Sequence, residues 1–312
     1  MTGTQQPSAG RPGGAPFGRM LTAMITPMAA DGALDADGAA RLATYLVDDM
    51  RNDGLVISGT TGESPTTSDA EKDRLLRAVI EAVGDRATVV AGVGTNDTAH
   101  TIELAQQAER AGADALLVVT PYYNKPPQSG LLAHFTAVAD ATGLPNMLYD
   151  IPGRTGVPIA TETLIQLAQH PRIVAVKDAK GDLGASSQVM LATDLVYYSG
   201  EDMLNLPMLA IGAAGFVSVV GHVVGDRLHE MIDAYLGGRV GEAREIHREL
   251  LPVYIGVMTR TQGAIATKAA LSLLGLPGGT VRGPLIDATP QQVERLRTDL
   301  VAGAVKLPGG AA

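Results

Sequence analysis

The sequence predicts an α/β protein, a (β/α)8 TIM barrel with a C-terminal helical appendage. Eight short apolar runs recur between residues 21 and 220, and a segment with helical periodicity follows each of them. This is the pattern of buried parallel strands joined by crossover helices. The chain has 312 residues, which is enough for a barrel of about 250 residues and an appendage. The residues after 238 continue the helical periodicity without a further strand pattern.

We expect four segments along the chain. The first sixteen residues are polar and rich in glycine and proline, and they lack the apolar core of a signal peptide. The last residues, LPGGAA, have a similarly loose composition. The expected segments are a flexible tail at 1–16, the barrel at 17–238, a helical domain at 239–304 and a loose tail at 305–312.

The first four strands are expected at short runs of valine, isoleucine, leucine, alanine and methionine. Each run is too short for a helix and stops at small or polar residues, as a buried strand does. The expected strands are 21–28, 54–58, 87–94 and 115–120. The helices expected after them are a stretch that ends at residue 50, then 69–83, 97–111 and 130–142.

The same alternation predicts the second half of the barrel. The expected strands are 146–151, 172–176, 195–199 and 215–220, and the helices that follow them are 161–169, 183–192, 203–211 and 226–236. The appendage is read as three helices, at 240–254, 263–274 and 290–301. Pro252 is expected to end or kink the first of these, because proline cannot donate the helical hydrogen bond. A doubly wound open sheet is the rival fold, but its Gly-rich G-x-G-x-x-G signature does not follow the first strand.

Composition excludes several classes of partner and site. The chain has 24 basic and 33 acidic side chains and a net charge of −9, which argues against a nucleic-acid partner. It has no cysteine, so it forms neither disulfides nor thiolate metal sites. Its six histidines form no H-E-x-x-H pair, so we predict no metal. No apolar run is long enough to span a membrane, and we expect a cytoplasmic protein without a membrane partner.

Residues suited to chemistry gather at the predicted carboxyl ends of the strands, where the active sites of such barrels lie. Five of the eight tyrosines fall there, and so does a lysine at the end of a buried strand. The segments are G-T-T-G-E-S at 59–64, T-P-Y-Y at 120–123, Y-D-I-P-G-R at 149–154, K-D at 177–178 and Y-Y-S-G-E-D at 197–202.

Lys177 is the residue least expected in that position, and it suits Schiff-base chemistry. A partly desolvated lysine has a lowered pKa and can attack a ketone as the free amine. Tyr149 ends the neighbouring strand and can transfer protons. The loop that holds Thr60 and Thr61 offers amide groups and hydroxyls for a carboxylate, and Arg154 can grip a second carboxylate bidentately. Taken singly, each residue also has an ordinary role at a strand end or on the surface.

The motifs G-T-T-G-E-S, T-P-Y-Y-N-K-P, Y-D-I-P-G-R-T-G and V-K-D, in this order and spacing, resemble those of the dihydrodipicolinate synthase family, pyruvate-dependent class I aldolases. The resemblance runs from about residue 18 to the C-terminal helices. It implies condensation of pyruvate with L-aspartate 4-semialdehyde to 4-hydroxy-tetrahydrodipicolinate, the first committed step toward diaminopimelate and lysine. It implies no cofactor beyond the covalent adduct on Lys177, and a homotetramer built as a dimer of dimers.

The resemblance also implies a role for each site residue. Lys177 forms the Schiff base with pyruvate, and Thr60 links Tyr149 to Tyr123, which comes from the neighbouring subunit, in a proton relay. Pyruvate is held at Thr61 and the semialdehyde carboxylate at Arg154. The backbone of Val217 and the residue Gly200 line the site, and Tyr122 lies at the dimer contact. Asp150 stands where many members have asparagine, and we expect little effect from it.

The sequence leaves three alternative functions open and predicts one regulatory property. Sialic-acid lyases and 2-keto-3-deoxy-sugar-acid aldolases share the lysine and the tyrosine but usually lack Arg154. A phosphate-handling barrel is disfavoured because the acidic pair at 201–202 repels phosphate. In feedback-sensitive relatives, histidines and a glutamate line a lysine-binding cleft. Here the matching positions hold Asp69, Lys72 and His100, so we expect no strong inhibition by lysine.

Overall fold

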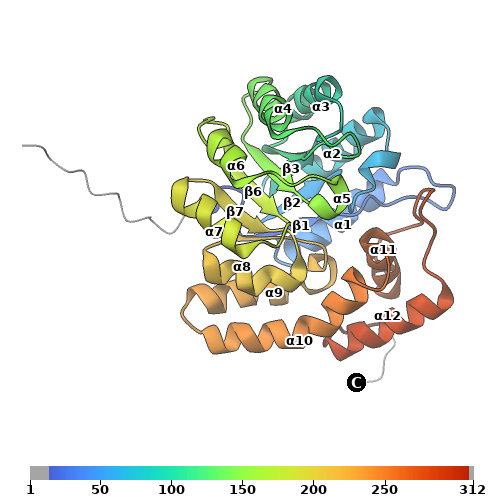
Figure 1. Cartoon of the computed structure of the whole chain (residues 1–312). Helices are drawn as coiled ribbons and strands as arrows, with labels where there is room; N and C mark the ends of the chain where they lie inside the picture. Colours follow the sequence, from blue (N-terminus) through green and yellow to red (C-terminus); the bar gives the residue numbers. More distant parts are fainter. Residues whose placement is uncertain (1–13, 309–312) are drawn as a thin grey trace, which may run out of the picture.

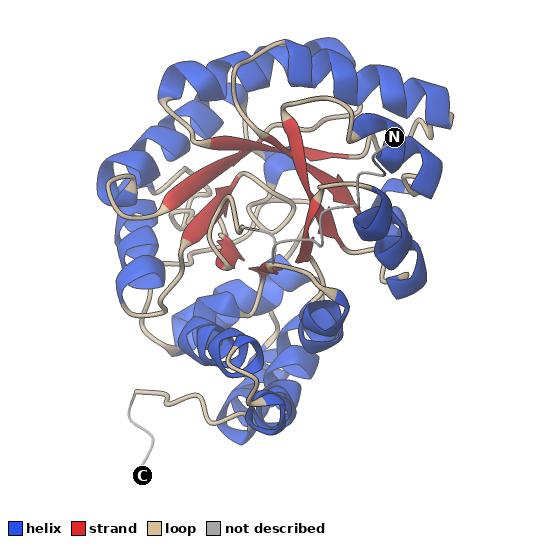
Figure 2. Ribbon diagram, turned by 90° about the vertical axis from the view of Figure 1, so that its left-hand side faces the viewer, coloured by secondary structure: helices blue, strands red, loops and turns tan. Residues whose placement is uncertain are grey.

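The structure is a computed structural model that describes residues 14–308. Most of the predicted N-terminal tail and residues 309–312 of the C-terminal tail therefore lie outside the described residues. Eight parallel strands form a closed barrel in the order of the sequence, which confirms the predicted fold. Figures 1 and 2 show the strands at the centre, the helices around them and the last helices grouped at one side.

The strands are short and their side chains are almost entirely buried. They are β1 (Met20–Ala23), β2 (Gly54–Ile57), β3 (Thr88–Gly92), β4 (Ala115–Val119), β5 (Asn146–Asp150), β6 (Ile173–Asp178), β7 (Val196–Ser199) and β8 (Gly215–Ser218). The barrel closes where β1 pairs with β8, with Met20 opposite Phe216. Both faces of such a sheet are covered, and this explains why the strands read as continuous apolar runs.

The helices of the barrel follow the predicted order. They are α1 (Ala36–Asp48), α2 (Asp69–Val83), α3 (Thr98–Ala111), α4 (Gln128–Asp140), α5 (Pro152–Thr155), α6 (Thr161–Leu167), α7 (Leu183–Ala192), α8 (Asn205–Ile211) and α9 (Gly221–Leu236). Two 3-10 turns, η1 (Ser64–Thr66) and η2 (Asp202–Leu204), precede α2 and α8. The one-turn helix α5, which carries Arg154, was not predicted because four residues are too few to show a helical period.

Several predicted strands are too long at their carboxyl ends, and β1 and β8 show the reason. After β1, the Ile25 amide donates to His222 Nε2 at 3.0 Å and the Thr26 hydroxyl donates to the Gly62 carbonyl at 2.6 Å. After β8, the amides of Val219 and Val220 donate to Asp202. In each place a side chain or a loop carbonyl replaces the ladder partner, so an apolar, buried segment continues without being a strand.

The C-terminal segment contains α10 (Val240–Met258), α11 (Gly263–Leu273) and α12 (Pro290–Ala302). The expectation that α10 ends by residue 254, at or near Pro252, is wrong. Helix α10 continues to Met258, and Val253, Tyr254 and Val257 beyond the proline are fully buried. Burial of such side chains stabilises by about 1.5–3 kcal/mol each, which offsets the cost of about 3 kcal/mol for an interior proline.

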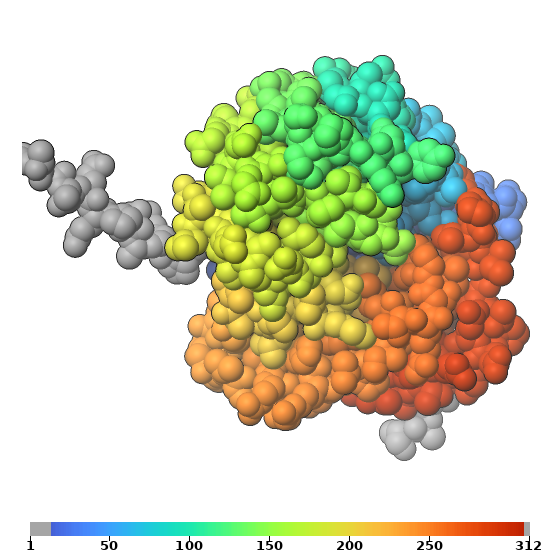
Figure 3. All heavy atoms as spheres, in the orientation of Figure 1, coloured from blue at the N-terminus to red at the C-terminus, as the bar shows by residue number. Residues whose placement is uncertain are grey.

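The C-terminal segment packs against the barrel on a surface that reaches from α9 to the N-terminal half of the chain. Helix α10 packs on α9 and α12, and Val305 and Leu307 pack against the same apolar cluster. In Figure 3 the orange and red C-terminal segment forms the lower and right side of the molecule and meets blue N-terminal residues at the edge. No helix within residues 14–308 is long and apolar enough to cross a membrane.

Candidate active site

A cavity of about 240 Å³ opens at the carboxyl ends of β2 to β5. It is lined by residues after each of these strands, including Thr60, Tyr149, Arg154 and Tyr122. Sites for drug-sized ligands begin at about 300 Å³, so this cavity suits small metabolites. Three side chains predicted for the site, from three different loops or strands, therefore line one space.

Lys177 lies beside this cavity on β6, where its backbone is the register partner of Tyr149 on β5. Its side chain is buried, with only 3% of the residue exposed, and Nζ lies 4.2 Å from the centre of the Tyr149 ring. Within residues 14–308 no carboxylate pairs with this amine. Burial lowers the pKa of Lys177 to about 8, against the opposing charge of Asp202. The amine is therefore prepared to lose its proton near neutral pH.

Tyr149 shares this apolar environment, and its hydroxyl stays protonated. Burial raises the pKa of Tyr149 to about 12, while the charge of Arg154 and the hydroxyl of Thr60 act in the opposite direction. A phenol in this state can donate a proton to a developing oxyanion and take it back. An amine that loses its proton more readily than an ordinary lysine thus lies in contact with a phenol that keeps its proton.

Two further predicted residues lie near Lys177 and Tyr149, although neither lines the cavity. An added Cβ at Gly200 would lie 2.9 Å from Lys177 Cγ and 3.1 Å from its Cε, so the lysine chain rests against this glycine. Val217 on β8 is fully buried in the barrel interior, in the same apolar cluster as Tyr149. Thr61 is buried next to Thr60 in the loop after β2.

Tyr123 is placed differently from the other predicted residues. It is 88% exposed and adopts a φ of 73°, in the left-handed region that non-glycine residues rarely occupy. It does not line the cavity of its own chain, although its neighbour Tyr122 does. Within one described chain, therefore, Tyr123 is not brought together with Lys177.

Two of the five tyrosines at strand ends do not belong to the site. Tyr197 is buried between the barrel and the helices, and Tyr198 points toward the amino-terminal end of the barrel, where its hydroxyl donates to the Gly18 carbonyl at 3.0 Å. Side chains alternate across a strand, so neighbouring tyrosines cannot both face the interior. Their position in the sequence was therefore a misleading signal.

The sequence did not predict that Asp202 holds the loop after β7 near Lys177. Its carboxylate accepts hydrogen bonds from the amides of Val219 and Val220 at 2.9 and 3.0 Å and from the side chains of Asn205 and Ser218. These bonds fix the loop after β7 to the end of β8, and the charge of Asp202 acts on Lys177. In the sequence it was visible only as half of an acidic pair.

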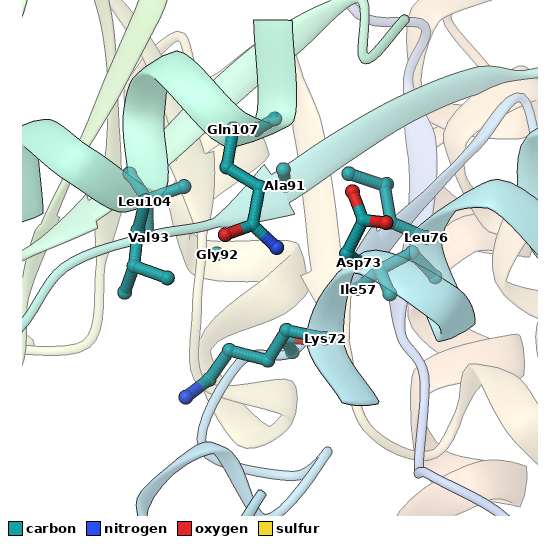
Figure 4. Close-up of a pocket in the computed structure, with 11 residues that line it drawn as sticks. Ile57, Lys72, Asp73, Leu76, Ala91, Gly92, Val93, Leu104 and Gln107 are labelled. Atoms are coloured by element: carbon teal, nitrogen blue, oxygen red, sulfur yellow. The ribbon is translucent and has the colours of Figure 1, made fainter. Parts of the chain in front are cut away.

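A second pocket, shown in Figure 4, lies outside the barrel between α2 and α3. Its volume is about 20 Å³, enough for about one water molecule. Ile57, Leu76 and Leu104 form apolar walls, with Lys72, Asp73 and Gln107 around them. Ser58 and Gly92 border both pockets, but this one is too small to hold a substrate.

Comparison with known proteins gives consistent results. A model of the "Dihydrodipicolinate synthetase family" matches residues 16–302. The chain is 67% identical over 292 residues to 4-hydroxy-tetrahydrodipicolinate synthase 2 of Streptomyces coelicolor, covering 94% of this chain and 97% of the relative. It is 71% identical over 288 residues to the 4-hydroxy-tetrahydrodipicolinate synthase of Acidothermus cellulolyticus, covering 92% and 93%.

Solved structures agree with these relatives. The dihydrodipicolinate synthase of Cyanidioschyzon merolae with lysine bound superposes with a TM-score of 0.91 at 41% identity, covering 93% of this chain and 99% of that one. The Bacillus anthracis enzyme superposes with a TM-score of 0.89 at 40% identity, covering 91% and 98%.

Proposed function

Because this chain belongs to the dihydrodipicolinate synthetase family, we propose that it is a 4-hydroxy-tetrahydrodipicolinate synthase, a class I aldolase-type lyase. It condenses pyruvate with L-aspartate 4-semialdehyde to 4-hydroxy-tetrahydrodipicolinate, the first committed step of diaminopimelate and lysine biosynthesis. The observation that carries this assignment to individual residues is Lys177, a buried amine in contact with Tyr149 beside a cavity lined by Thr60 and Arg154.

The reaction begins with attack of the Lys177 amine on the ketone of pyruvate. Tyr149 protonates the carbinolamine oxygen, which leaves as water, and an imine remains. Tyr149, which has given up its proton, then accepts one from the methyl group, and the imine becomes an enamine. Thr60 is the next group in the proton relay, and its hydroxyl acts on Tyr149. The keto-acid carboxylate is held by Thr61, and Gly200 and Val217 lie near Lys177 and Tyr149.

The second half of the reaction forms the carbon–carbon bond. The enamine carbon attacks the aldehyde of the semialdehyde, and the aldehyde oxygen takes up a proton. The substrate's own amine then attacks the imine carbon that still joins the former pyruvate to Lys177. The Lys177 amine leaves with a proton, and the ring closes as a cyclic imine. All the proton transfers use side chains of the protein and water, so the reaction needs no cofactor and no metal.

Arg154 favours the semialdehyde over a sugar as second substrate. It lines the cavity, and its guanidinium group forms neither an ion pair nor a hydrogen bond with another side chain in residues 14–308. An unpaired guanidinium at the mouth of a site offers two parallel donors to a carboxylate. A sugar-acid aldolase is the second candidate in this class, and it would need hydroxyl-binding groups at this position.

Two measurements test the proposal. Pyruvate and borohydride should attach one reduced pyruvate to the peptide that contains Lys177. Pyruvate with aspartate 4-semialdehyde should turn over faster than pyruvate with sugar aldehydes such as glyceraldehyde. Absence of an adduct would exclude the Schiff-base mechanism, and a preference for the sugar aldehyde would assign the chain to the sugar-acid aldolases.

We further propose a cytoplasmic homotetramer in which Tyr123 completes the relay of the adjoining subunit. Its 88% exposure and its left-handed backbone support an intermolecular role. Two inactive variants, Tyr123→Phe and Lys177→Ala, should regain part of the activity when their subunits are exchanged, because mixed dimers contain one intact site. Proven exchange without recovery would show that the site is not shared.

Weak or no inhibition by lysine also remains a proposal. Asp69 binds His100 at 2.9 Å, and Lys72 lies 3.6 Å from Asp69 and donates to the Thr67 carbonyl at 2.8 Å. The one carboxylate at these positions is thus already paired twice, so an added ammonium group gains little there. Half-inhibition by lysine below about 1 mM, which corresponds to about 4 kcal/mol of affinity, would contradict this proposal.

A further inference from the structure

A buried ion pair joins the loop after β2 to the C-terminal segment. Lys268 Nζ in α11 lies 2.6 Å from Glu63 Oε1, and the two side chains are 3% and 1% exposed. The other carboxylate oxygen of Glu63 accepts the Arg282 amide at 2.8 Å. Lys268 also donates to the Thr280 carbonyl at 2.6 Å. The Glu63 carboxylate is therefore held from two sides by residues more than 200 positions away.

The backbone of Glu63 is tied to the substrate loop just as closely. Its φ of 55° and ψ of 37° are left-handed, a conformation that ordinarily favours glycine. Its amide donates to the Thr60 carbonyl at 3.1 Å, and its own carbonyl accepts the Thr67 hydroxyl at 2.9 Å. A shift of Glu63 would therefore move Thr60, because one hydrogen bond joins the two residues directly.

The opposite side of the loop is fixed independently. The Thr26 hydroxyl donates to the Gly62 carbonyl at 2.6 Å, and a Cβ added to Gly62 would lie 3.1 Å from the Met24 carbonyl. The loop after β1 therefore supports Gly62 while α11 holds Glu63. The α11 contact depends on a charge, whereas the contact with Thr26 does not.

An ion pair in this position is not needed for stability alone. Two buried charges lose their hydration, and an apolar pair of the same volume often stabilises a protein equally well. What the charges add is a fixed geometry between α11 and the loop. We propose that Glu63 and Lys268 are positioning residues, through which the C-terminal segment sets the geometry of Thr60 and Thr61 at the keto-acid end of the active site. This inference rests on the proposed function.

A neighbouring ion pair supplies a matched control. The Arg282 guanidinium binds Glu71 in α2 with two hydrogen bonds, at 2.9 and 2.5 Å. This pair joins the same two parts of the chain, and the Arg282 guanidinium also donates to the Thr66 carbonyl at 2.8 Å, but Glu71 itself has no contact with Glu63, Thr60 or Thr61. Replacing Glu71 by glutamine therefore loosens the same interface and leaves the Glu63 carboxylate with both of its partners.

The experiment compares E63Q with E71Q in steady-state kinetics at a temperature well below either melting temperature. For E63Q we expect kcat to fall about tenfold and the KM for pyruvate to rise about tenfold, the scale of a small misplacement of a binding group. The KM for the semialdehyde should stay within about twofold, because Arg154 is on another loop. E71Q should stay within about twofold in all three constants, whatever its melting temperature. Wild-type kinetics in E63Q would overturn the proposal.

The double variant E63Q/K268M separates positioning from an unpaired charge, and it covers the case in which E63Q does not fold. It contains neither charge, so it avoids the cost of a buried lone lysine. The proposal predicts the same kinetic defect in the double variant, and normal kinetics there would overturn it.

Wild-type enzyme separates the inference from the function on which it rests. If wild type did not turn over both substrates, the proposed function would fail. The pyruvate concentration needed for half-maximal borohydride labelling would still compare E63Q with wild type, and equal concentrations would overturn the inference.

Discussion

Lys177 at the barrel mouth and Lys268 at the contact between barrel and C-terminal segment are equally buried, each with 3% of its surface exposed. They differ in the group that the amine meets. Lys268 has a carboxylate at 2.6 Å, whereas Lys177 has the ring of Tyr149 at 4.2 Å and no ion-pair partner in residues 14–308. Burial alone therefore does not decide what a lysine can do. A paired amine holds two parts of the chain together, and an unpaired one is available as a nucleophile.

The strongest test of this comparison removes each amine in turn. Lys177→Met should abolish the pyruvate adduct and lower turnover by about 10⁴-fold or more, as loss of a nucleophile does, with no loss of thermal stability. Lys268→Met should still form the adduct but lose about 3–5 kcal/mol of stability, because Glu63 is left buried and unpaired. Mass spectrometry and thermal melts measure both effects. Labelling of Lys177→Met at full stoichiometry would contradict the assignment.

Tyr149→Phe sharpens the comparison by keeping the ring and removing the hydroxyl. The amine of Lys177 then meets the same apolar surface, so the pH at which it becomes reactive should not move. Turnover should fall about 10²-fold, the contribution of one general acid–base group. Steady-state rates and pH-dependent labelling separate the two properties. A large change in the pH at which labelling is half-maximal, together with normal turnover, would contradict both expectations.

The pH dependence of labelling tests whether Lys177 is unpaired in solution. Its pKa is lowered to about 8 by burial, so the free amine increases about tenfold per pH unit below 8 and levels off above it. Adduct formation with pyruvate, trapped by cyanoborohydride between pH 6 and 9, should follow this curve. A rate that still rises steeply at pH 9 would mean an ordinary lysine with a pKa near 10.4.

Arg154→Lys replaces the cation at the cavity without changing the amine below it. A point charge cannot reproduce the bidentate grip of guanidinium on a carboxylate, so the KM for the semialdehyde should rise about tenfold, corresponding to about 1.4 kcal/mol. Pyruvate labelling should be nearly unchanged. Unchanged use of the semialdehyde in initial-rate assays would favour the sugar-acid aldolase candidate.

A third amine, which is only partly buried, gives the smallest effect. Lys180 lies 3.4 Å from Asp150 Oδ2, a longer contact than that of Lys268, and burial raises the pKa of Asp150 to about 6. A raised acid pKa means that the folded state binds the proton more tightly, so stability falls as pH rises through 6. Between pH 5 and 7, Asp150→Asn should gain about 1 kcal/mol relative to wild type. Urea unfolding at both pH values measures this, and parallel pH profiles would contradict it.

Local signals predicted the barrel because each strand and its helix have a short-range pattern. The strands of the barrel and the order of its helices appear in the structure as expected, and Leu183–Ala192 and Asp69–Val83 agree to the residue. The apolar runs alone could not show where ladder pairing stops, because at Ile25 and Val219 the partner comes from His222 and Asp202. Helix α10 continues beyond Pro252 for a related reason, because the residues that pack against it are remote in sequence.

The residues of the candidate site also divide into those that the sequence could predict and those that it could not. Lys177, Tyr149, Thr60 and Arg154 come together because each stands at a strand end, and strand ends meet at the barrel mouth. Tyr197 and Tyr198 occupy similar positions, but alternation turns Tyr197 toward the helices, and Tyr198 reaches the Gly18 carbonyl at the amino-terminal end of the barrel. The pairing of Glu63 with Lys268 could not be predicted, because nothing near either residue indicates the other.

Closure of the barrel through β1 and β8 has a consequence for a chain made from its N-terminus. Met20 finds its partner Phe216 about 200 residues later. At about 5–20 residues per second, a ribosome needs about 10–40 seconds to reach that partner. During that time one edge of β1 offers unpaired amide and carbonyl groups to any other nascent strand. In the growing chain, β1 is therefore the strand most exposed to mispairing. Its partner Phe216 is among the last residues of the barrel to be translated.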